Sequence, residues 1–127
     1  MAVAQGLLYT KDHEWAKVEG DMVTVGITDY AQEQLGEVVF VELPKVGKEF
    51  GSHKEFAVVE SSKAASDVYC PAAGKVTEVN TELETTPELV NKDCYGEGWL
   101  CKLKIADKAS LSNLMDAKKY EEYLKTL

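Results

Sequence analysis

Apolar and polar residues alternate along several short segments of the chain, and this period of two is typical of half-buried β-strands. Segments 15–19 and 22–27 flank Gly20 and Asp21, which predicts a hairpin with a two-residue turn. Further strands are predicted at 37–43, 56–60, 67–70, 75–80 and 99–105. On the last of these, alternation places on one face Trp99, Cys101, Leu103 and Ile105. The pattern therefore indicates a mainly β protein.

Helical spacing replaces this alternation in two places. In the stretch TDYAQEQLG, Thr28 or Asp29 can cap a short helix that Gly36 ends. Near the C-terminus, apolar residues recur at helical spacing over about 108–126, and Asp116 is a candidate helix cap within this tail. The polar stretch from 81 to 98 is predicted to be a loop. We expect a short internal helix and a helical C-terminal tail.

The length of 127 residues fits one domain with one core. A hydrophobic fraction of 45% and a charged fraction of 28% are typical of a globular chain. No stretch rich in proline, glycine or serine divides the sequence. We therefore predict a single domain over 1–127, with a β core at about 15–105 and the helical tail at about 108–126.

The charge balance narrows the class of partner. Fourteen lysines and no arginine stand against twenty-two acidic residues, for a net charge of −8, and the lysines form no cluster. Binding to nucleic acid or to an anionic membrane requires concentrated positive charge, so neither partner is expected. No apolar run approaches the roughly 20 residues that a membrane helix needs. The acidity favours protein partners with basic docking faces, or else serves only solubility.

The sequence offers no conventional catalytic or metal site. Cysteines 70, 94 and 101 form no C-x-x-C pair, and His13 and His53 are far apart, so neither zinc spacing nor a disulfide framework is present. Cys101 is interpreted as a small buried apolar residue, and we expect a reducing compartment. Glycine-rich phosphate loops, G-x-S-x-G and H-E-x-x-H are all missing. We therefore predict no catalytic residue and no metal.

One lysine has unusual surroundings. Between two predicted strands, Lys63 is flanked only by residues with short side chains, namely Ser61, Ser62, Ala64, Ala65 and Ser66. An enzyme could reach the lysine amine there without meeting bulky groups, and the flanking strands would hold the tip in place. A solvated surface lysine with no role is the alternative interpretation.

Several motifs in order resemble one known family. The segments YTKDHEW, TVGITDYAQEQLGEVVFVELP, ESSKAASDV, PELVNKDCYGEGW and DAKKYEEYL are similar to the H protein of the glycine cleavage system, from about Tyr9 to the C-terminus. The resemblance implies a lipoyl-type barrel-sandwich hybrid fold and identifies Lys63 as the residue that carries lipoic acid in amide linkage. The family usually has valine where this chain has Ser62.

The resemblance also implies a role. The chain would be a carrier and not an enzyme, shuttling the aminomethyl group of glycine between other proteins. Its partners would be the pyridoxal-phosphate glycine decarboxylase, the tetrahydrofolate-dependent aminomethyltransferase, dihydrolipoyl dehydrogenase, which reoxidises the carrier, and a lipoate-attaching enzyme. We expect a monomer. The location would be the mitochondrial matrix in a eukaryote and the cytoplasm in a bacterium, and the sequence does not decide between them.

A pocket for the loaded arm is implied as well, with Glu14 and Asp67 as its acidic residues. Read from the sequence alone, Glu14 is a solvated residue before Trp15, and Asp67 caps the turn after Ser66. Two apolar residues and one histidine are candidates for the pocket wall, namely Ile27, Leu35 and His13, with core packing as the alternative for the apolar pair.

Other functions stay open at this point. A biotin carrier would share the fold, but its lysine typically lies between methionines. A lipoyl domain of a 2-oxo acid dehydrogenase usually has aspartate before the lysine and a linker to a larger chain. The protein could also act as a donor of lipoyl groups to other enzymes, or as an unmodified interaction module.

Overall fold

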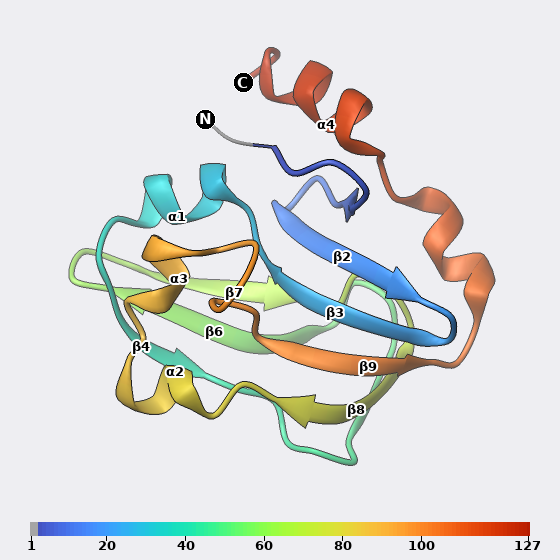
Figure 1. The fold of residues 1–127 in the computed structure, drawn as a ribbon, viewed down its shortest axis with the longest axis horizontal. Helices are drawn as coiled ribbons and strands as arrows, with labels where there is room; N and C mark the ends of the chain where they lie inside the picture. Colours follow the sequence, from blue (N-terminus) through green and yellow to red (C-terminus); the bar gives the residue numbers. More distant parts are fainter. Residues whose placement is uncertain (1–2) are drawn as a thin grey trace.

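A computed structural model describes residues 3–127, and antiparallel strands make up most of its regular structure (Figure 1). The strands are β1 (Leu8–Tyr9), β2 (Glu14–Glu19), β3 (Met22–Ile27), β4 (Val38–Glu42), β5 (Glu49–Phe50), β6 (Glu55–Ser61), β7 (Ala65–Tyr69), β8 (Gly74–Val79) and β9 (Cys101–Ile105). The helices are α1 (Asp29–Leu35), α2 (Glu82–Thr85), α3 (Leu89–Lys92), the 3-10 helix η1 (Lys108–Asn113) and α4 (Ala117–Leu124). Every helix among these residues is too short or too polar to span a lipid bilayer.

The strands form two sheets. One has the order β1-β2-β3-β9-β8-β5 and the other β4-β6-β7, and all neighbours are antiparallel. The predicted β2–β3 hairpin is confirmed, since Glu19 pairs with Met22 and leaves only Gly20 and Asp21 in the turn. Gly20 has a φ of 66°, a conformation that favours glycine in such a turn.

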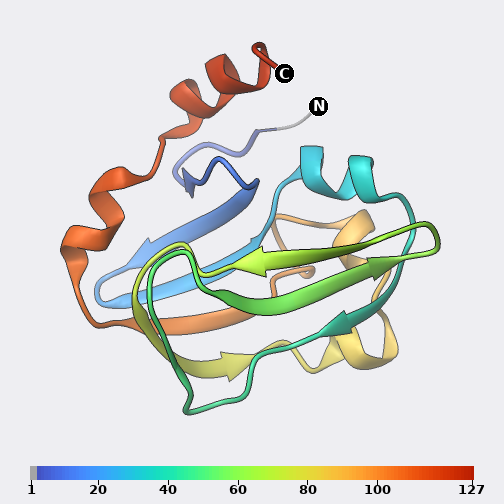
Figure 2. The same cartoon turned by 180° about the vertical axis from the view of Figure 1, so that it is seen from behind.

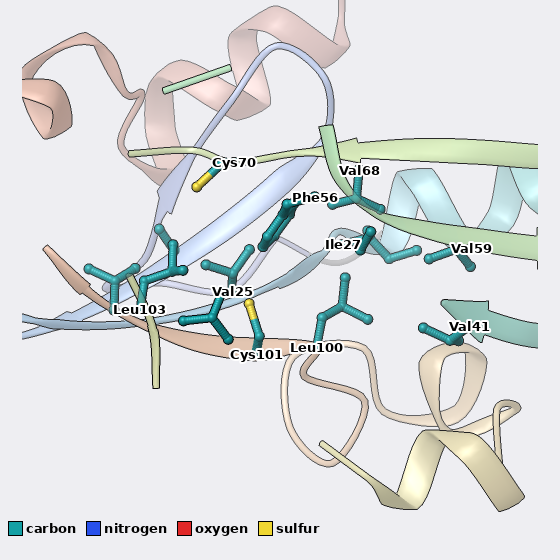
Figure 3. Close-up of a cluster of buried hydrophobic side chains, with 14 of the residues drawn as sticks. Val25, Ile27, Val41, Phe56, Val59, Val68, Cys70, Leu100, Cys101 and Leu103 are labelled. Carbon is teal, nitrogen blue, oxygen red and sulfur yellow. The ribbon is translucent and has the colours of Figure 1, made fainter. Parts of the chain in front are cut away.

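The main hydrophobic core lies between the two sheets (Figure 3). Val25 and Leu103 enter it from the larger sheet, and Val41, Val59 and Val68 enter it from the smaller one. All five side chains are at most 3% exposed, as the alternation of the strands requires. Each sheet has one apolar face, and burial of these two faces against each other holds the sheets together.

A second apolar cluster joins the two ends of the chain. Tyr9, Trp15, Ala117 and Tyr120 are buried together, and the rings of Tyr9 and Tyr120 stack with centroids 4.5 Å apart. Tyr9 also pairs with Met115 in an isolated antiparallel bridge. As a result, α4 lies beside the N-terminal segment in both views of the molecule (Figures 1 and 2).

Two expectations about the elements are wrong in detail. The stretch 81–98 is not a plain loop, because it contains the one-turn helices α2 and α3. Strand β9 begins at Cys101, two residues later than predicted, and Trp99 packs with the second cluster and not beside Cys101 in the core. The predicted helical tail is confirmed, and it consists of the 3-10 helix η1 followed by α4. In addition, β1 and β5 were not predicted, since each is only two residues long.

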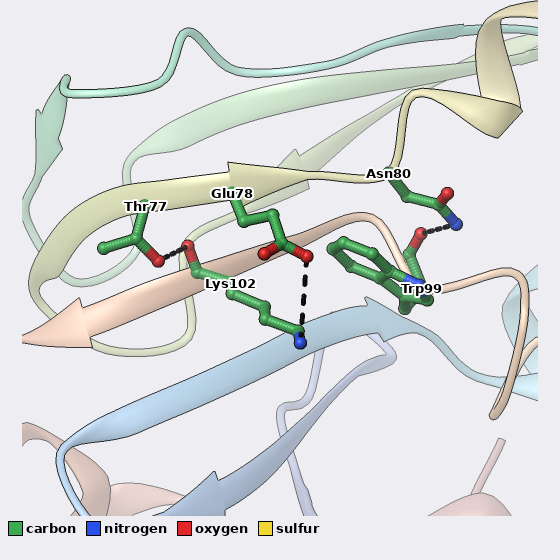
Figure 4. Close-up of polar contacts among 5 residues, drawn as sticks. All are labelled: Thr77, Glu78, Asn80, Trp99 and Lys102. Atoms are coloured by element: carbon green, nitrogen blue, oxygen red, sulfur yellow. Dashed lines mark hydrogen bonds and ion pairs between the residues drawn. The ribbon is translucent and has the colours of Figure 1, made fainter.

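Polar contacts explain why β9 starts late (Figure 4). The Asn80 side-chain amide donates to the backbone carbonyls of Glu97 and Trp99, at 2.7 Å and 2.9 Å. These bonds hold the segment before Cys101 in a turn at the end of β8. The Lys102 ammonium then lies 3.8 Å from the Glu78 carboxylate across the β8–β9 pair, which is an exposed contact of small energetic value.

Candidate functional site

Lys63 lies in the tight turn between β6 and β7 that forms the tip of the projecting hairpin (Figure 2). The Ser61 hydroxyl oxygen accepts from the amides of Lys63 and Ala64, at 3.3 Å and 3.1 Å, and the Ser61 amide donates to the Ala64 carbonyl at 2.7 Å. Ser62, Lys63 and Ala64 are exposed. The turn between the two strands is shorter than predicted, because Ala65 and Ser66 already belong to β7.

The Lys63 side chain lies against the end of α1. A Cβ atom added to Gly36, the residue that ends this helix, would be 3.3 Å from Cε of Lys63 and 3.8 Å from its Nζ. Gly36 has a φ of 84°, so both its conformation and the space above it favour glycine. The base of any group attached to Lys63 therefore starts beside the last residues of α1.

Asn91 of α3 fixes this end of α1. Its side-chain amide donates to the Gly36 carbonyl and to Gln32 Oε1, each at 2.9 Å, and its Oδ1 accepts from the Val38 amide at 2.8 Å. The connection from α1 to β4 in turn supports the hairpin tip, because the Glu37 carbonyl accepts from the Ser62 amide at 3.2 Å. Asn91 thus positions the lysine turn from a distant part of the sequence.

A cleft of about 190 Å³ runs along α1, between this helix and β7. Glu14, Asp67, Ile27, Leu35 and His13 all line it. The structure therefore brings together every residue that the sequence named for the pocket. Ile27 and Leu35 belong to the main core as well, so for these two residues both interpretations hold.

Glu14 is a buried carboxylate and not a solvated residue. Glu14 is only 2% exposed. Its Oε1 accepts a hydrogen bond from the Thr10 hydroxyl at 2.6 Å, and its Oε2 accepts one from the Tyr69 amide at 3.1 Å. Burial raises the pKa of Glu14 to about 7, while these two hydrogen bonds oppose the rise. Near neutral pH the group is therefore poised between its neutral and its charged form.

Asp67 has a different environment. It is exposed, it lies within β7 opposite Val58, and it does not cap the turn. Because Val68 points into the core, the Asp67 side chain starts from the opposite face of the strand. Asp67 lines the cleft and also a second groove on the outer face of the smaller sheet. It therefore lies at the rim of the cleft, whereas Glu14 lies at its floor.

His13 connects the cleft to the C-terminal helix. Its Nδ1 lies 2.8 Å from the Tyr120 hydroxyl, which lies 2.7 Å from the Thr28 hydroxyl, and Thr28 caps α1. Burial lowers the pKa of His13, and burial raises the pKa of Tyr120. When His13 is neutral, Tyr120 can donate to Nδ1 and accept from Thr28. The Tyr120 hydroxyl of α4 thus contacts both His13 in the wall of the cleft and Thr28 at the start of α1.

Comparison with known proteins gives one consistent result. The family model described as Glycine cleavage H-protein matches residues 7–127. The chain belongs to this family. It is 57% identical over 123 residues to the glycine cleavage system H protein of Symbiobacterium thermophilum, with 97% of this chain and 96% of that one covered. It is 56% identical over 126 residues to a Thermus thermophilus protein of the same name, with 99% and 98% covered.

A solved structure agrees with the family assignment. The crystal structure of a glycine cleavage system H protein from Mycobacterium marinum superposes with a TM-score of 0.89 at 37% identity, covering 98% of this chain and 100% of that one. The likeness confirms the predicted fold class, a mainly β, lipoyl-type barrel-sandwich hybrid with a short internal helix and C-terminal helices. Within residues 3–127 the strands form two sheets and not one closed barrel.

The cysteines are buried thiols, as expected for Cys101. Cys70, Cys94 and Cys101 are all free and buried. Burial raises the pKa of Cys70 to about 11 and that of Cys94 to about 12, and it raises the pKa of Cys101 further. Such thiols are poor nucleophiles at neutral pH, because the thiolate is the reactive form.

Two positioning residues were missed from the sequence, namely Asn91 and Tyr120. Asn91 stood in a stretch predicted as a loop, and Tyr120 was assigned only to the apolar face of the tail. The neighbours of Asn91 along the chain carry no signal for its distant hydrogen-bond partners, since these partners are fixed by tertiary packing alone.

Proposed function

We propose that Lys63 carries lipoic acid in amide linkage and that the chain is the carrier component of the glycine cleavage system. The observation that carries this proposal is the pairing of an exposed lysine at a fixed hairpin tip with a cleft that contains a buried carboxylate. Family membership supports the same role. The carrier would hold no catalytic residue of its own.

The residues present fit such a group. Lys63 is surrounded by short side chains, and its stem lies over Gly36, where no side chain obstructs an arm directed along α1. Ile27 and Leu35 offer an apolar wall to the hydrocarbon part of the arm. Glu14 offers a carboxylate at the floor of the cleft. An apolar arm with a cationic end matches this order of surfaces.

Attachment uses the amine of Lys63. At neutral pH this amine is an ammonium without a free electron pair, so the attaching enzyme must take a proton and supply an activated lipoyl donor, whose leaving group departs as the amide forms. When bound, the lipoyl group supplies a disulfide that can be opened, loaded with an aminomethyl group and reoxidised. The protein residues position that chemistry and do not perform it.

Glu14 has the environment to hold a cationic cargo. In the empty cleft, burial favours its neutral form. An ammonium entering the cleft would offset the cost of the buried negative charge and favour the ionised form, in which a charge-assisted hydrogen bond becomes available. The cleft would also exclude water from a labile cargo. In this proposal the glycine decarboxylase loads the carrier, the aminomethyltransferase unloads it and dihydrolipoyl dehydrogenase reoxidises it.

The assignment of Lys63 is tested by intact mass. The wild type, Lys63→Arg and the control Lys54→Arg, another exposed lysine, are incubated with a lipoate-attaching enzyme, lipoate and ATP. We expect wild type and Lys54→Arg to gain one lipoyl group and Lys63→Arg to gain none, because arginine cannot form this amide. A lipoyl mass on Lys63→Arg would refute the site, and an unmodified wild type would support the interaction module instead.

The role of the cleft is tested separately, through the rate at which the loaded protein loses its cargo spontaneously. Glu14→Gln should accelerate release by on the order of ten- to a hundredfold, since one charge-assisted hydrogen bond is worth roughly 1.5–3 kcal/mol. Asp67→Asn should act in the same direction and less strongly, because Asp67 is exposed. Unchanged release in both variants, at full lipoylation, would contradict the pocket role.

A further inference from the structure

The outer face of the smaller sheet presents an ordered set of side chains to solvent. Opposite the inward-facing row of Val41, Val59 and Ser66, two rows point outward. One row consists of Phe40, Glu60 and Ala65, and the other of Glu42, Val58 and Asp67. We call the outward residues together with the neighbouring Val39 the outer-sheet patch.

The apolar part of this patch is unusually exposed. Phe40 is 50% exposed and Val39 is 51% exposed, because a register irregularity between Val38 and Phe40 places both side chains outside the core. Together they form a contiguous apolar patch, and such exposed patches mark contact surfaces when they are rimmed by polar residues. A single aromatic residue in such a place can supply much of the energy of an interface.

The charged residues of the patch are all acidic. Glu60 and Glu42 flank it on the two outward rows, and Asp67 follows across the sheet. Lys45 and Lys48, in the connection after β4, line the adjoining groove and lie outside the patch. The patch therefore complements an apolar pocket with lysine or arginine at its rim.

The patch is continuous with the lysine turn. Glu60 and Ala65 are the last cross-strand pair before the tip, and the Glu37 carbonyl accepts from the Ser62 amide immediately before β4 begins. The cleft along α1 lies on the other side of β7. A protein bound to the patch would thus contact the base of Lys63 and, through Asp67, the rim of the cleft.

We propose that the outer-sheet patch docks the enzyme that attaches lipoate to Lys63, through an apolar pocket with a basic rim on that enzyme. This inference rests on the proposed function. The attaching enzyme must reach Nζ of the unmodified lysine, which extends from the hairpin by only the length of one lysine side chain. Enzymes that act on the far end of an attached arm can dock farther from the hairpin. The surface beside the tip therefore fits the attaching enzyme best.

The test measures kcat/KM for lipoylation of the unmodified chain. Phe40→Ala should lower kcat/KM by on the order of tenfold, mainly through a higher KM. Val46→Ala is the matched control, since Val46 is 56% exposed and lies outside the patch, and it should change kcat/KM by less than about twofold. Glu60→Gln should lower kcat/KM at low salt, and the difference from wild type should shrink at high salt.

Further measurements distinguish a failure of the docking inference from a failure of the proposed carrier function. Thermal unfolding should show that Phe40→Ala folds as the wild type does, which its exposure leads us to expect. If wild type is lipoylated and Phe40→Ala reacts equally well, the docking inference is wrong and the carrier function stands. If wild type accepts no lipoate, the carrier function itself fails.

Two other occupants of the patch are outcomes of the same test. Fully lipoylated Phe40→Ala should retain the wild-type rate with the decarboxylase and the aminomethyltransferase. A loss there as large as the loss in lipoylation would overturn the assignment to the attaching enzyme. So would a wild-type dimer in sedimentation velocity that Phe40→Ala abolishes.

Discussion

The hairpin tip and the cleft are built in different ways, although both contribute to one site. At the tip, Ser61 holds the turn through hydrogen bonds to residues two and three positions away. In the cleft, the Glu14 carboxylate binds the Tyr69 amide across 55 positions, and His13 lies beside the Tyr120 hydroxyl across 107 positions. The tip is a local structure, and the cleft depends on the packing of the whole chain.

This difference matches the two proposed roles: the tip would present Lys63 to other proteins, and the cleft would protect the bound cargo from water. Ser62, Lys63 and Ala64 at the tip are exposed and contribute little to the core, so changes there should alter stability less than changes in the cleft do. The cleft shares Ile27 and Leu35 with the core and contains a buried carboxylate, so changes there should alter stability and leave Lys63 reactive. Four variants test this separation, from the largest expected effect on stability to the smallest.

Glu14→Gln should remove a pH dependence of stability. Burial raises the pKa of Glu14 from 4.5 to about 7 on folding, so its favourable contribution is complete below the unfolded pKa and is lost as the pH rises through about 7. The free energy of unfolding of wild type relative to Glu14→Gln should therefore fall by on the order of 2–3 kcal/mol between about pH 4.5 and pH 8.5.

Urea unfolding of both proteins at a series of pH values measures this difference. His13 has a lowered pKa, so it destabilises the fold at acid pH, but it is present in both proteins and cancels. A difference that does not vary with pH would show that Glu14 does not titrate in the folded cleft. The lipoylation rate should be unchanged in the variant.

Tyr120→Phe should cost about 1–3 kcal/mol of stability, because it leaves His13 Nδ1 and the Thr28 hydroxyl without their shared partner. The ring that stacks on Tyr9 is retained. The control Tyr123→Phe loses only an exposed 3.3 Å bond to the Lys11 carbonyl and should cost less than about 0.5 kcal/mol. Equal unfolding free energies for the two variants would contradict the importance of the Tyr120 link.

Ser61→Ala should loosen the tip. Its hydroxyl accepts from two backbone amides, so we expect a cost of about 0.5–1.5 kcal/mol and a rate of lipoylation lowered by about twofold. Ser61→Thr keeps the hydroxyl and serves as the control. If the alanine and threonine variants are lipoylated at the same rate, the local hydrogen bonds do not position Lys63.

Ser62→Val should have the smallest effect. Ser62 is exposed and is held through its backbone amide, so stability should change by less than about 0.5 kcal/mol. Lipoylation should be unchanged or slightly faster, since valine is the usual residue of the family at this place. A marked loss of lipoylation would show that the attaching enzyme depends on serine.

The sequence by itself determined the longer strands, the hairpin turn at Gly20, the short helix with Thr28 or Asp29 as its cap, and the exposed turn around Lys63. These features depend on local periodicity and on the conformational preferences of a few residues, which a linear pattern contains. The resemblance to a family added the candidates Glu14 and Asp67, and both line the cleft. Their roles as pocket residues remain predictions.

Only the tertiary structure decided the environments of these residues. Glu14 is buried and accepts hydrogen bonds from Thr10 and Tyr69, whereas Asp67 is exposed because strand alternation directs Val68 to the core. Asn91 and Trp99 likewise depend on partners far away in the chain. Burial and the satisfaction of polar groups arise from contacts between distant segments, and no pattern along the sequence specifies which segments meet.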